Sequence, residues 1–409
     1  MKTLLQINLC VNCLSTGKIS EDIGLAAMQA GWKSYIAGAV IGKNPSKSNV
    51  IKIGSSKYIY FPYFESLVFD NHCLGLSARK ATKRLIAEIE KIKPDLIQLH
   101  TIHAYYLNLK LLFEYFATIN TPIVWTLHDC WSFTGHCAHF DAVGCEQWKT
   151  QCHKCPQLKE YPRSVGWVDN SRNNYDIKKK LFTSLGDRLH IVTVSQWLKN
   201  LVEKSFLRGL APQVIYNGVN TEIYKPTDSN TLISSLGLKN KTIFLGVASA
   251  WGEKKGLKDY FALSEFLDED MRIILVGLKR EVINKLPPNI IGVEKTENTH
   301  QLIEFYSAAD IILNLSIEET FGLTTIEGMA CGTPGIVYDK TASPELITPE
   351  TGLIVKAHDI KGLKASIEKI ITKGKKYYSH NCRSRVLNFF NAEKQYEKYI
   401  ALYNSIIGS

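Results

Sequence analysis

The chain has 409 residues, of which 45% are hydrophobic and 22% are charged, and its 49 Lys and Arg exceed its 39 Asp and Glu by ten. This length and composition predict two or three folded domains, and they exclude a disulfide-stapled mini-protein, a disordered protein and a coiled coil. The positive charge favours anionic partners such as nucleotide phosphates, lipid head groups or nucleic acid.

The first half of the chain alternates short apolar runs with amphipathic stretches, which is the pattern of parallel strands joined by crossover helices. Strands are predicted at residues 4–9, 34–39, 96–99, 123–127 and 191–194. A helix is predicted between the second and third of these strands, with Ser77 as its N-cap and an end near Lys93, just before Pro94.

The second half repeats this pattern after the turn-rich residues 216–220. Strands are predicted at 242–248, 271–276, 311–314 and 335–338. Tyrosines at helical spacing predict a terminal helix over about 393–407. We therefore expect an α/β protein with two doubly wound Rossmann-like domains. The expected divisions are 1–212 (N-terminal domain), 213–390 (C-terminal domain) and 391–409 (a terminal helix that packs back on the N-terminal domain).

The passage from Ser316 to Gly335 predicts an anion-binding site. A short helix is expected from about Leu323 to a glycine cap at Gly332. The first N–H groups of a helix have no partner within the helix, so those of Gly322 and Leu323 are suited to binding a pyrophosphate.

Two carboxylates flank this helix start. Glu319 precedes the helix and Glu327 lies about one turn inside it, so seven residues separate them. Carboxylates bind hydroxyl groups, and a pair of them around a phosphate site is what a sugar nucleotide needs. A surface helix with solvated acids is the alternative.

With this motif the chain resembles the family 4 retaining glycosyltransferases of the GT-B architecture, whose hallmark is two Glu at this spacing. The resemblance implies that Glu319 contacts the donor sugar and that Glu327 binds the ribose hydroxyls. It also implies that the two domains face a cleft, with the acceptor on the N-terminal side and the nucleotide-sugar donor on the C-terminal side. Residues 194–195 and 217–219 match further landmarks of the family, so the resemblance covers essentially the whole chain.

Two cations follow the strand at 242–248. Lys254 and Lys255 are placed to neutralise a diphosphate as its bond to the sugar breaks. The family usually has an Arg five residues before the second of these lysines, where this chain has Ala250, so we expect Lys254 to compensate. Solvated loop lysines are the alternative. Because Lys255 and the helix amides supply positive charge, no catalytic metal is expected.

Two sites are predicted in the N-terminal domain. Gly17 lies after the first strand, where the resemblance implies a glycine-rich loop that contacts the donor. His128 follows the strand at 123–127, and the resemblance implies that it contacts the donor sugar. A tight turn and a structural histidine, respectively, are the alternatives.

A cluster of cysteines follows His128. Its members are Cys137, Cys145, Cys152 and Cys155. Four thiolates within about twenty residues are suited to a tetrahedral structural zinc site, and the C-x-x-C spacing of the last two is typical of one. Free thiols packed in a loop, or a redox or disulfide role, are the alternatives.

The chain offers one candidate membrane surface, although its apolar runs are far shorter than the roughly 20 residues of a membrane-spanning helix. The aromatic residues 58–64 are followed by a basic stripe of Arg79, Lys80, Lys83 and Arg84. Together these are suited to an anionic membrane surface that carries a lipid-linked acceptor. A solvated helix face is the alternative.

The expected function is transfer of a sugar from a nucleotide-diphosphate donor to a hydroxyl of a glycan or lipid-linked glycan, with retention of the anomeric configuration. The resemblance is to bacterial members that build capsule, exopolysaccharide or O-antigen. We expect a cytoplasmic enzyme, at or near the inner face of the membrane, with no nucleic acid partner. A nucleotide-sugar 2-epimerase of the same architecture and a catalytically silent sugar-nucleotide binding subunit are the alternatives.

Overall fold

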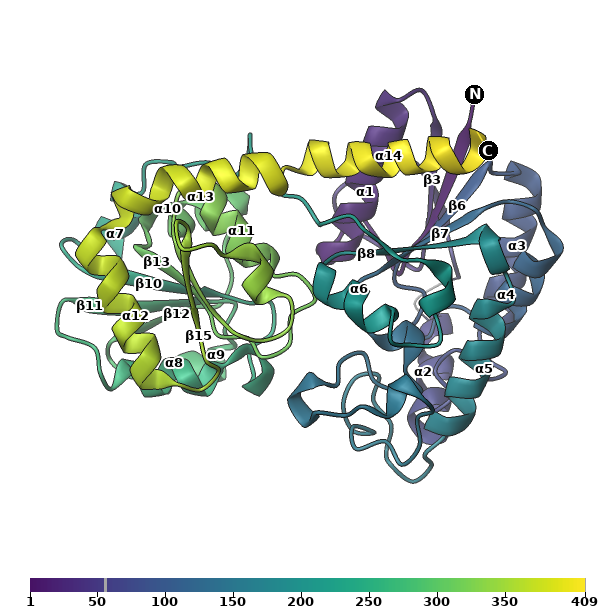
Figure 1. Cartoon of the computed structure of the whole chain (residues 1–409), viewed down its shortest axis with the longest axis horizontal. Coiled ribbons are helices and arrows are strands. Elements are labelled where there is room, and N and C mark those ends of the chain that lie inside the picture. The colour runs from purple at the N-terminus through teal and green to yellow at the C-terminus, as the bar shows by residue number, and fades with distance from the viewer. Residues whose placement is uncertain (55–56, 409) are drawn as a thin grey trace. The chain divides into compact units, whose positions relative to one another are not determined.

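The computed structural model describes residues 1–54 and 57–408 and divides the chain into two units. Unit 1 comprises Met1–Tyr216 together with the chain from Gln395 onward, and unit 2 comprises Asn217–Lys394. Each unit contains one large parallel sheet with helices on its faces (Figure 1). The boundary lies four residues after the position expected from the sequence, 216 instead of 212.

Unit 1 contains a seven-stranded parallel sheet in the order β5-β3-β1-β6-β7-β8-β9. Its strands are β1 (Thr3–Ile7), β3 (Lys33–Gly38), β5 (Asn49–Lys52), β6 (Leu96–Leu99), β7 (Ile123–Leu127), β8 (Leu189–Thr193) and β9 (Gln213–Val214). The short strands β2 (Cys10–Val11) and β4 (Val40–Ile41) pair separately. Every residue of β6 and β7 is buried, because helices cover both faces of a parallel sheet.

The chain forms α-helices between these strands. They are α1 (Leu14–Gln29), α2 (Lys57–Phe69), α3 (Arg79–Ile92), α4 (Leu109–Thr118), α5 (Ser171–Thr183) and α6 (Gln196–Val202). The predicted N-cap of α3 is wrong. Ala78 occupies that position with φ of 58°, and no side chain caps the helix. The backbone N–H of Ser77 instead donates to the carboxylate of Glu65 at 3.0 Å.

The chain between β7 and α5 contains the cysteine cluster and forms three 3-10 turns: η1 (Trp131–Phe133), η2 (Asp141–Val143) and η3 (Gln147–Lys149). We call residues 130–157 the cysteine-rich segment. Its interior is aromatic: the ring of Trp148 lies 5.3 Å from that of Phe133 and 4.9 Å from that of Phe140. The segment therefore has a small core of its own.

Unit 2 contains a six-stranded parallel sheet in the order β12-β11-β10-β13-β14-β15. Its strands are β10 (Thr242–Val247), β11 (Met271–Val276), β12 (Ile290–Val293), β13 (Ile311–Asn314), β14 (Gly335–Tyr338) and β15 (Gly352–Val355). Its helices are α7 (Asn230–Ser235), α8 (Leu257–Ser264), α9 (Arg280–Ile283), α10 (Thr299–Ala308), α11 (Leu323–Ala330), α12 (Ile360–Lys373) and α13 (Lys375–Phe389). Both units are thus doubly wound, as the sequence predicts.

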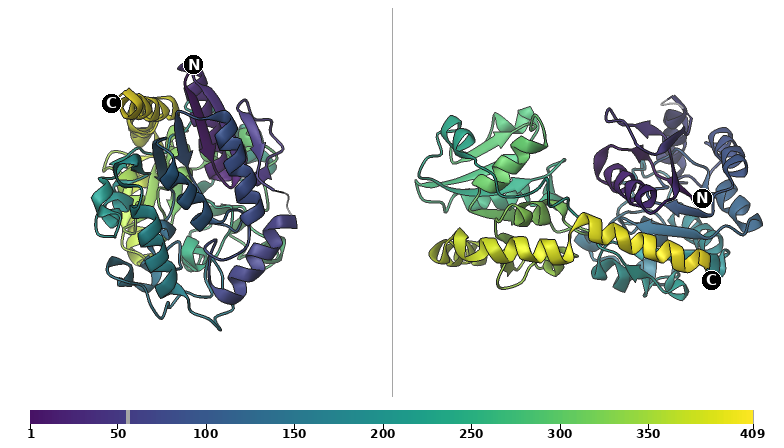
Figure 2. Two further views of the ribbon diagram at one scale, coloured as in Figure 1. Left: turned by 90° about the vertical axis from the view of Figure 1, so that its right-hand side faces the viewer. Right: turned by 90° about the horizontal axis from the view of Figure 1, so that it is seen from above.

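The terminal helix α14 (Ala392–Gly408) packs against unit 1 through its later residues. The hydroxyl groups of Tyr399 and Thr126 are 3.2 Å apart, and Tyr403 donates a hydrogen bond to Gln98 Oε1. Lys2 Nζ donates to Asn404 Oδ1 at 3.0 Å, so the two ends of the chain lie side by side (Figure 2).

Candidate functional site

The loop between β13 and α11 positions the predicted anion site in unit 2. Gly322 is the N-cap residue of α11 and has φ of 102°, a conformation that L side chains rarely adopt. Asn314, at the end of β13, donates to Thr325 Oγ1 in the first turn of the helix at 3.0 Å. This contact holds the helix start, with Leu323 as its first residue, against the strand that precedes it.

Both the backbone N–H and the backbone carbonyl of Glu319 form hydrogen bonds to the segment that follows β14. Its N–H donates to Thr341 Oγ1 at 2.9 Å, and its carbonyl oxygen accepts from the N–H of Ala342 at 3.1 Å. The side chain is therefore presented from a braced loop rather than from a mobile one.

Lysines from the loop after β10 meet carboxylates from the loop after β13. Lys255 Nζ lies 2.5 Å from Glu319 Oε1, and Lys254 Nζ lies 2.9 Å from Glu318 Oε2. The backbone joins the same two loops, since the N–H of Ile317 donates to the carbonyl of Lys254 at 3.0 Å. The structure thus brings Lys255 to Glu319, the two residues expected to meet the phosphate and the sugar.

Glu318 is a residue that the sequence did not single out, because the family spacing selects its neighbour. Its side chain is only 2% exposed, whereas that of Lys254 is 36% exposed. A buried carboxylate needs a partner of opposite charge. Besides any contact with phosphate, Lys254 therefore also compensates the negative charge of Glu318.

Glu327 is positioned by an aromatic hydroxyl. Tyr306, a buried residue of α10, donates from its hydroxyl to Glu327 Oε2 at 2.7 Å. Burial first, and then the charge of Glu327, raise the pKa of Tyr306 well above its ordinary value, so this tyrosine stays a donor. Tyr224 also interacts with Glu327, and burial followed by that charge raises its pKa as well. Neither tyrosine carries a motif that would have identified it in the sequence.

In unit 1, His128 ends a chain of hydrogen bonds that begins at the buried Gln6. Gln6 donates through Nε2 to the carbonyl of Ser20 at 2.8 Å, so its Oε1 accepts from His100 Nε2 at 3.0 Å. His100 Nδ1 is then the acceptor for His128 Nε2, 3.1 Å away. Burial lowers the pKa of both histidines, that of His128 to about 4, so both rings are neutral. Gln6 thereby sets the tautomer of His128.

A second polar group lies beside His128. Asp129 Oδ2 is 2.8 Å from His103 Nε2, and Tyr161 Oη is 3.0 Å from His103 Nδ1. Burial alone would raise the pKa of Asp129, but the charge and hydrogen bond of His103 outweigh it and lower the pKa to about 2. Asp129 and His103 line a small hollow at the carboxyl ends of β6 and β7, together with His100, His128 and Trp131.

Gly17 differs from the sequence expectation. It lies in the first turn of α1 and not in a loop. A Cβ added there would be 3.1 Å from Cys10 Cβ and 3.2 Å from Cys10 O, so the glycine lets the helix pack closely on β2. Its contact with a donor stays a prediction.

The four cysteines of the predicted zinc site all belong to the cysteine-rich segment. Cys137 and Cys155 share a side-chain hydrogen bond, which raises the pKa of Cys137. Cys152 Sγ accepts from the N–H of Gly135 at 3.2 Å. Within the described residues, no three of these thiols have their sulfurs within 4.8 Å of one another. Zinc binding by the four thiolates stays a prediction.

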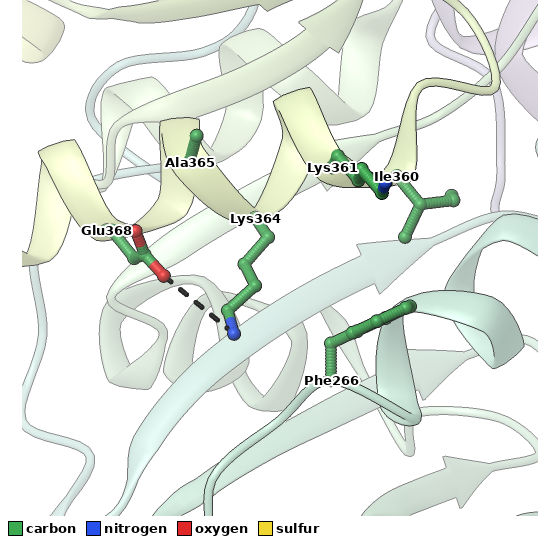
Figure 3. A pocket seen from close by; sticks show the side chains of 6 residues that line it. All are labelled: Phe266, Ile360, Lys361, Lys364, Ala365 and Glu368. Carbon is green, nitrogen blue, oxygen red and sulfur yellow. Dashed lines mark ion pairs between the residues drawn. The ribbon is translucent and has the colours of Figure 1, made fainter.

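A surface groove elsewhere on unit 2 is lined by Phe266 and one face of α12 (Figure 3). Its charged groups are Lys361 and the pair Lys364 and Glu368, whose Nζ and Oε1 atoms are 4.0 Å apart. None of the predicted site residues lines it.

Two models of glycosyltransferase families match the two halves of the chain. Residues 52–223 match the family model described as Glycosyltransferase Family 4, and residues 228–385 match the one described as Glycosyl transferases group 1. The chain is 24% identical over 327 residues to the putative colanic acid biosynthesis glycosyl transferase WcaC of Escherichia coli K12. That similarity spans 76% of this chain and 77% of WcaC.

Solved structures of the GT-B architecture share the fold. The sucrose-phosphate synthase of Thermosynechococcus elongatus superposes with a TM-score of 0.73 at 17% identity, over 100% of both chains. HepE of Anabaena, determined in complex with UDP-glucose, superposes with a TM-score of 0.68 at 14% identity, over 99% of this chain and 100% of HepE. The predicted GT-B fold is confirmed.

Proposed function

Because the chain belongs to the family 4 glycosyltransferases, we propose that it transfers a sugar from a nucleoside diphosphate donor to a hydroxyl group of a glycan or lipid-linked glycan. The observation that carries this proposal is the ion pair of Lys255 with Glu319 in the loop that leads into α11, the helix that carries Glu327. The complex of HepE with UDP-glucose supports a nucleotide sugar as the donor.

The proposed reaction retains the configuration at the anomeric carbon. The diphosphate binds the first N–H groups of α11 and Lys255, which stabilise the charge that develops on it as the glycosidic bond breaks. The acceptor oxygen bonds to the anomeric carbon on the face that the diphosphate leaves, and its proton passes to a phosphate oxygen. Glu319 binds the sugar, His128 orients it, and no sugar becomes attached to the protein. In retaining glycosidases, by contrast, a carboxylate forms that covalent bond.

The acceptor that we propose is part of a bacterial surface polysaccharide. The similarity to WcaC, described as a putative colanic acid biosynthesis enzyme, supports this class. We place the enzyme in the cytoplasm, where it would meet a lipid-linked acceptor at the inner face of the membrane.

A membrane-facing surface on unit 1 is part of this proposal. The side chains of Phe61 and Phe64 on α2 are 68% and 61% exposed. The basic residues at the start of α3 lie in one hollow, which Arg79, Lys80, Lys83 and Arg84 line. Exposed aromatic rings and basic side chains are both suited to an anionic bilayer surface. Among the helices that the structure describes, none has both the length and the apolar character of a bilayer span.

The donor is tested first. Purified protein is heated with UDP, GDP and ADP sugars, and a donor at 100 times its dissociation constant should add about 2.7 kcal/mol to the free energy of unfolding. Glu327→Ala should weaken binding of the free nucleotide, because a hydrogen bond to a charged group contributes roughly 1.5 to 3 kcal/mol. Glu319→Ala should spare nucleotide binding and lower the transfer rate, and Glu304→Ala, which removes an acid of α10 paired with His300, should change neither.

The reaction is tested next, with the selected donor and glycan acceptors. An α-linked donor should give an α-glycoside by NMR, with no sugar-modified peptide found by mass spectrometry. A β-linked product or a sugar on Glu319 would contradict the mechanism. Donor epimerised without acceptor would instead indicate an epimerase, and donor binding without turnover would indicate a binding subunit.

Membrane contact has its own test. The protein is sedimented with vesicles of anionic and of zwitterionic lipid, and binding is expected to the anionic ones. The double variant Lys80→Gln/Lys83→Gln should lose this binding. The matched variant Lys361→Gln/Lys364→Gln, which removes the same charge from α12, should keep it. Equal losses in the two variants would mean that net charge, rather than this surface, determines binding.

A further inference from the structure

Three side chains converge in the interior of unit 1, outside the site described above. Asp70 follows α2, His72 lies in the turn before α3, and His136 lies in the cysteine-rich segment. Asp70 Oδ1 is 2.5 Å from His72 Nε2 and 2.5 Å from His136 Nδ1, and these two nitrogens are 2.9 Å apart. At most 1% of each side chain is exposed.

The surroundings fix the carboxylate of this group. Asp70 Oδ2 accepts from the N–H of Asn170 at 2.9 Å, and the side chain of Asn174 donates to the carbonyl of Asp70. The backbone at Asp70 and His72 has φ of 51° and 35°, values that L residues rarely adopt. Such strained backbone persists only where the surrounding structure over-determines it, and it is concentrated at functional sites and ligand-binding positions.

Hydrogen bonding alone does not satisfy the two histidines. If both inner nitrogens carry their protons toward Asp70, the outer nitrogens, His72 Nδ1 and His136 Nε2, are acceptors that are buried and have no hydrogen-bond partner in the described part of the chain. If the protons lie on the outer nitrogens, two lone pairs and a carboxylate oxygen face one another within 2.9 Å. Each arrangement therefore costs free energy: the first leaves buried acceptors without a hydrogen bond, and the second brings lone pairs into contact with a carboxylate.

We propose that Asp70, His72 and His136 bind a divalent transition-metal ion, with zinc as the ion that fits best. Zinc lies about 2.0 to 2.2 Å from imidazole nitrogen and carboxylate oxygen. Tetrahedral angles at that distance require donor atoms roughly 3.4 Å apart, whereas these three atoms lie 2.5 to 2.9 Å apart. An ion would therefore be bound after each donor atom moves outward by about half an ångström. Two imidazoles and a carboxylate suit zinc, and they leave a fourth position for water or another ligand.

This ion would join segments that are distant in the sequence. His72 belongs to the turn between α2 and α3, and His136 belongs to the segment that follows β7. The carboxylate between them is in turn held by Asn170, next to α5. We infer a structural role, in which the ion fixes the cysteine-rich segment onto unit 1. The site is separate from the predicted thiolate site, although His136 and Cys137 are adjacent in the chain.

The first test is metal content. The full chain, purified without added metal, should contain close to one zinc per protein when measured by elemental analysis. The near-isosteric variants Asp70→Asn and His72→Gln should contain less than about a fifth of that amount. His190→Gln, which changes a half-buried histidine outside the group, and the double variant Cys145→Ser/Cys155→Ser should both retain the zinc. Zinc lost only from the cysteine variant would overturn the proposal.

The second test needs no variant and so does not depend on their folding. Chelated wild-type protein is titrated with Co²⁺ alone, and its absorption spectrum is recorded. Nitrogen and oxygen ligands give visible bands without the intense near-ultraviolet charge transfer that thiolates produce. Bands without that charge transfer would support the site. If the first equivalent of bound Co²⁺ shows strong sulfur-to-cobalt charge transfer, or if Co²⁺ does not bind, the proposal is overturned.

Discussion

The hydroxyl of Tyr306 donates to the carboxylate of Glu327 at 2.7 Å, so a buried residue of α10 determines the position of an acid on α11. Both helices flank β13, whose exit loop carries Glu319. The two acids of the motif are therefore braced differently: Glu319 through its backbone and through Lys255, and Glu327 through a tyrosine that is distant in the sequence.

Tyr306→Phe should weaken nucleotide binding while leaving both acids in place. Loss of the hydrogen bond leaves Glu327 less well oriented, and a typical contribution of about 1 kcal/mol corresponds to a roughly fivefold higher dissociation constant. Calorimetric titration with the free nucleoside diphosphate measures this change. Tyr377→Phe is the matched control, since that tyrosine is exposed on α13. Unchanged affinity in Tyr306→Phe would show that Glu327 needs no such support.

Lys254→Ala and Lys255→Ala should differ in their effects. Lys254 compensates the buried Glu318, so its removal should lower the free energy of unfolding by about 1 to 3 kcal/mol. Lys255 pairs with the more exposed Glu319, so its removal should mainly lower the transfer rate. Denaturant unfolding and initial-rate measurements on both variants separate the two effects. Equal loss of stability in both variants would contradict this division.

Acid should destabilise the fold through the buried His100 and the partly buried His128. Their folded pKa values lie below the ordinary value of 6.5, that of His128 at about 4. The unfolded chain therefore binds more protons than the folded chain between pH 6.5 and about 4, and the free energy of unfolding falls as the pH falls through that window. One group contributes at most about 1.4 kcal/mol per pH unit.

This pH dependence is measured by denaturant unfolding at about pH 7 and about pH 5. The variant His128→Gln should lose part of the slope, because glutamine does not titrate. His153→Gln, at an exposed position, is the control and should keep the slope of the wild type. A slope that is identical in all three proteins would assign the acid sensitivity to other groups.

Gly256→Ala should destabilise unit 2, whereas Gly252→Ala should not. Gly256 has φ of 68°, and a Cβ there would lie 2.2 Å from Leu315 O. The left-handed conformation alone costs an L residue roughly 1 to 2 kcal/mol, and the contact adds to that cost. Gly252 has extended backbone and no atom within 4 Å of an added Cβ. Thermal unfolding of both variants is the measurement, and similar melting temperatures would count against the argument.

The central strands could be predicted from the sequence, whereas the edge strands could not. The boundaries of β7, β13 and β14 match the predictions to the residue, because strands buried on both faces are mainly apolar runs. The outer strands β5 and β12 were not predicted. Both are partly exposed at an edge of their sheet. β5 has a polar residue at each end, and β12 is only four residues long and contains a glycine, so neither forms a clear apolar run. Ser77 has the right chemistry for a cap, but a tertiary contact with Glu65 prevails.

The residues of the candidate site also fall into two groups, those that could be predicted from the sequence and those that could not. Glu319, Glu327 and Lys255 could be predicted because their spacing along the chain is itself the motif. Tyr306 and Glu318 could not, because the roles of both arise from contacts between residues far apart in the sequence. The same limit applies to Asp70 and His136, which are 66 residues apart and meet only in the folded chain.

The terminal helix also affects the order in which the protein can fold during synthesis. Unit 2 is one continuous stretch of sequence, whereas unit 1 needs residues from both ends of the chain. The polar groups of Gln98 and Thr126 in the interior of unit 1 meet their partners Tyr403 and Tyr399 only after α14 has emerged from the ribosome. The unit whose synthesis begins first is therefore the one whose core is completed last.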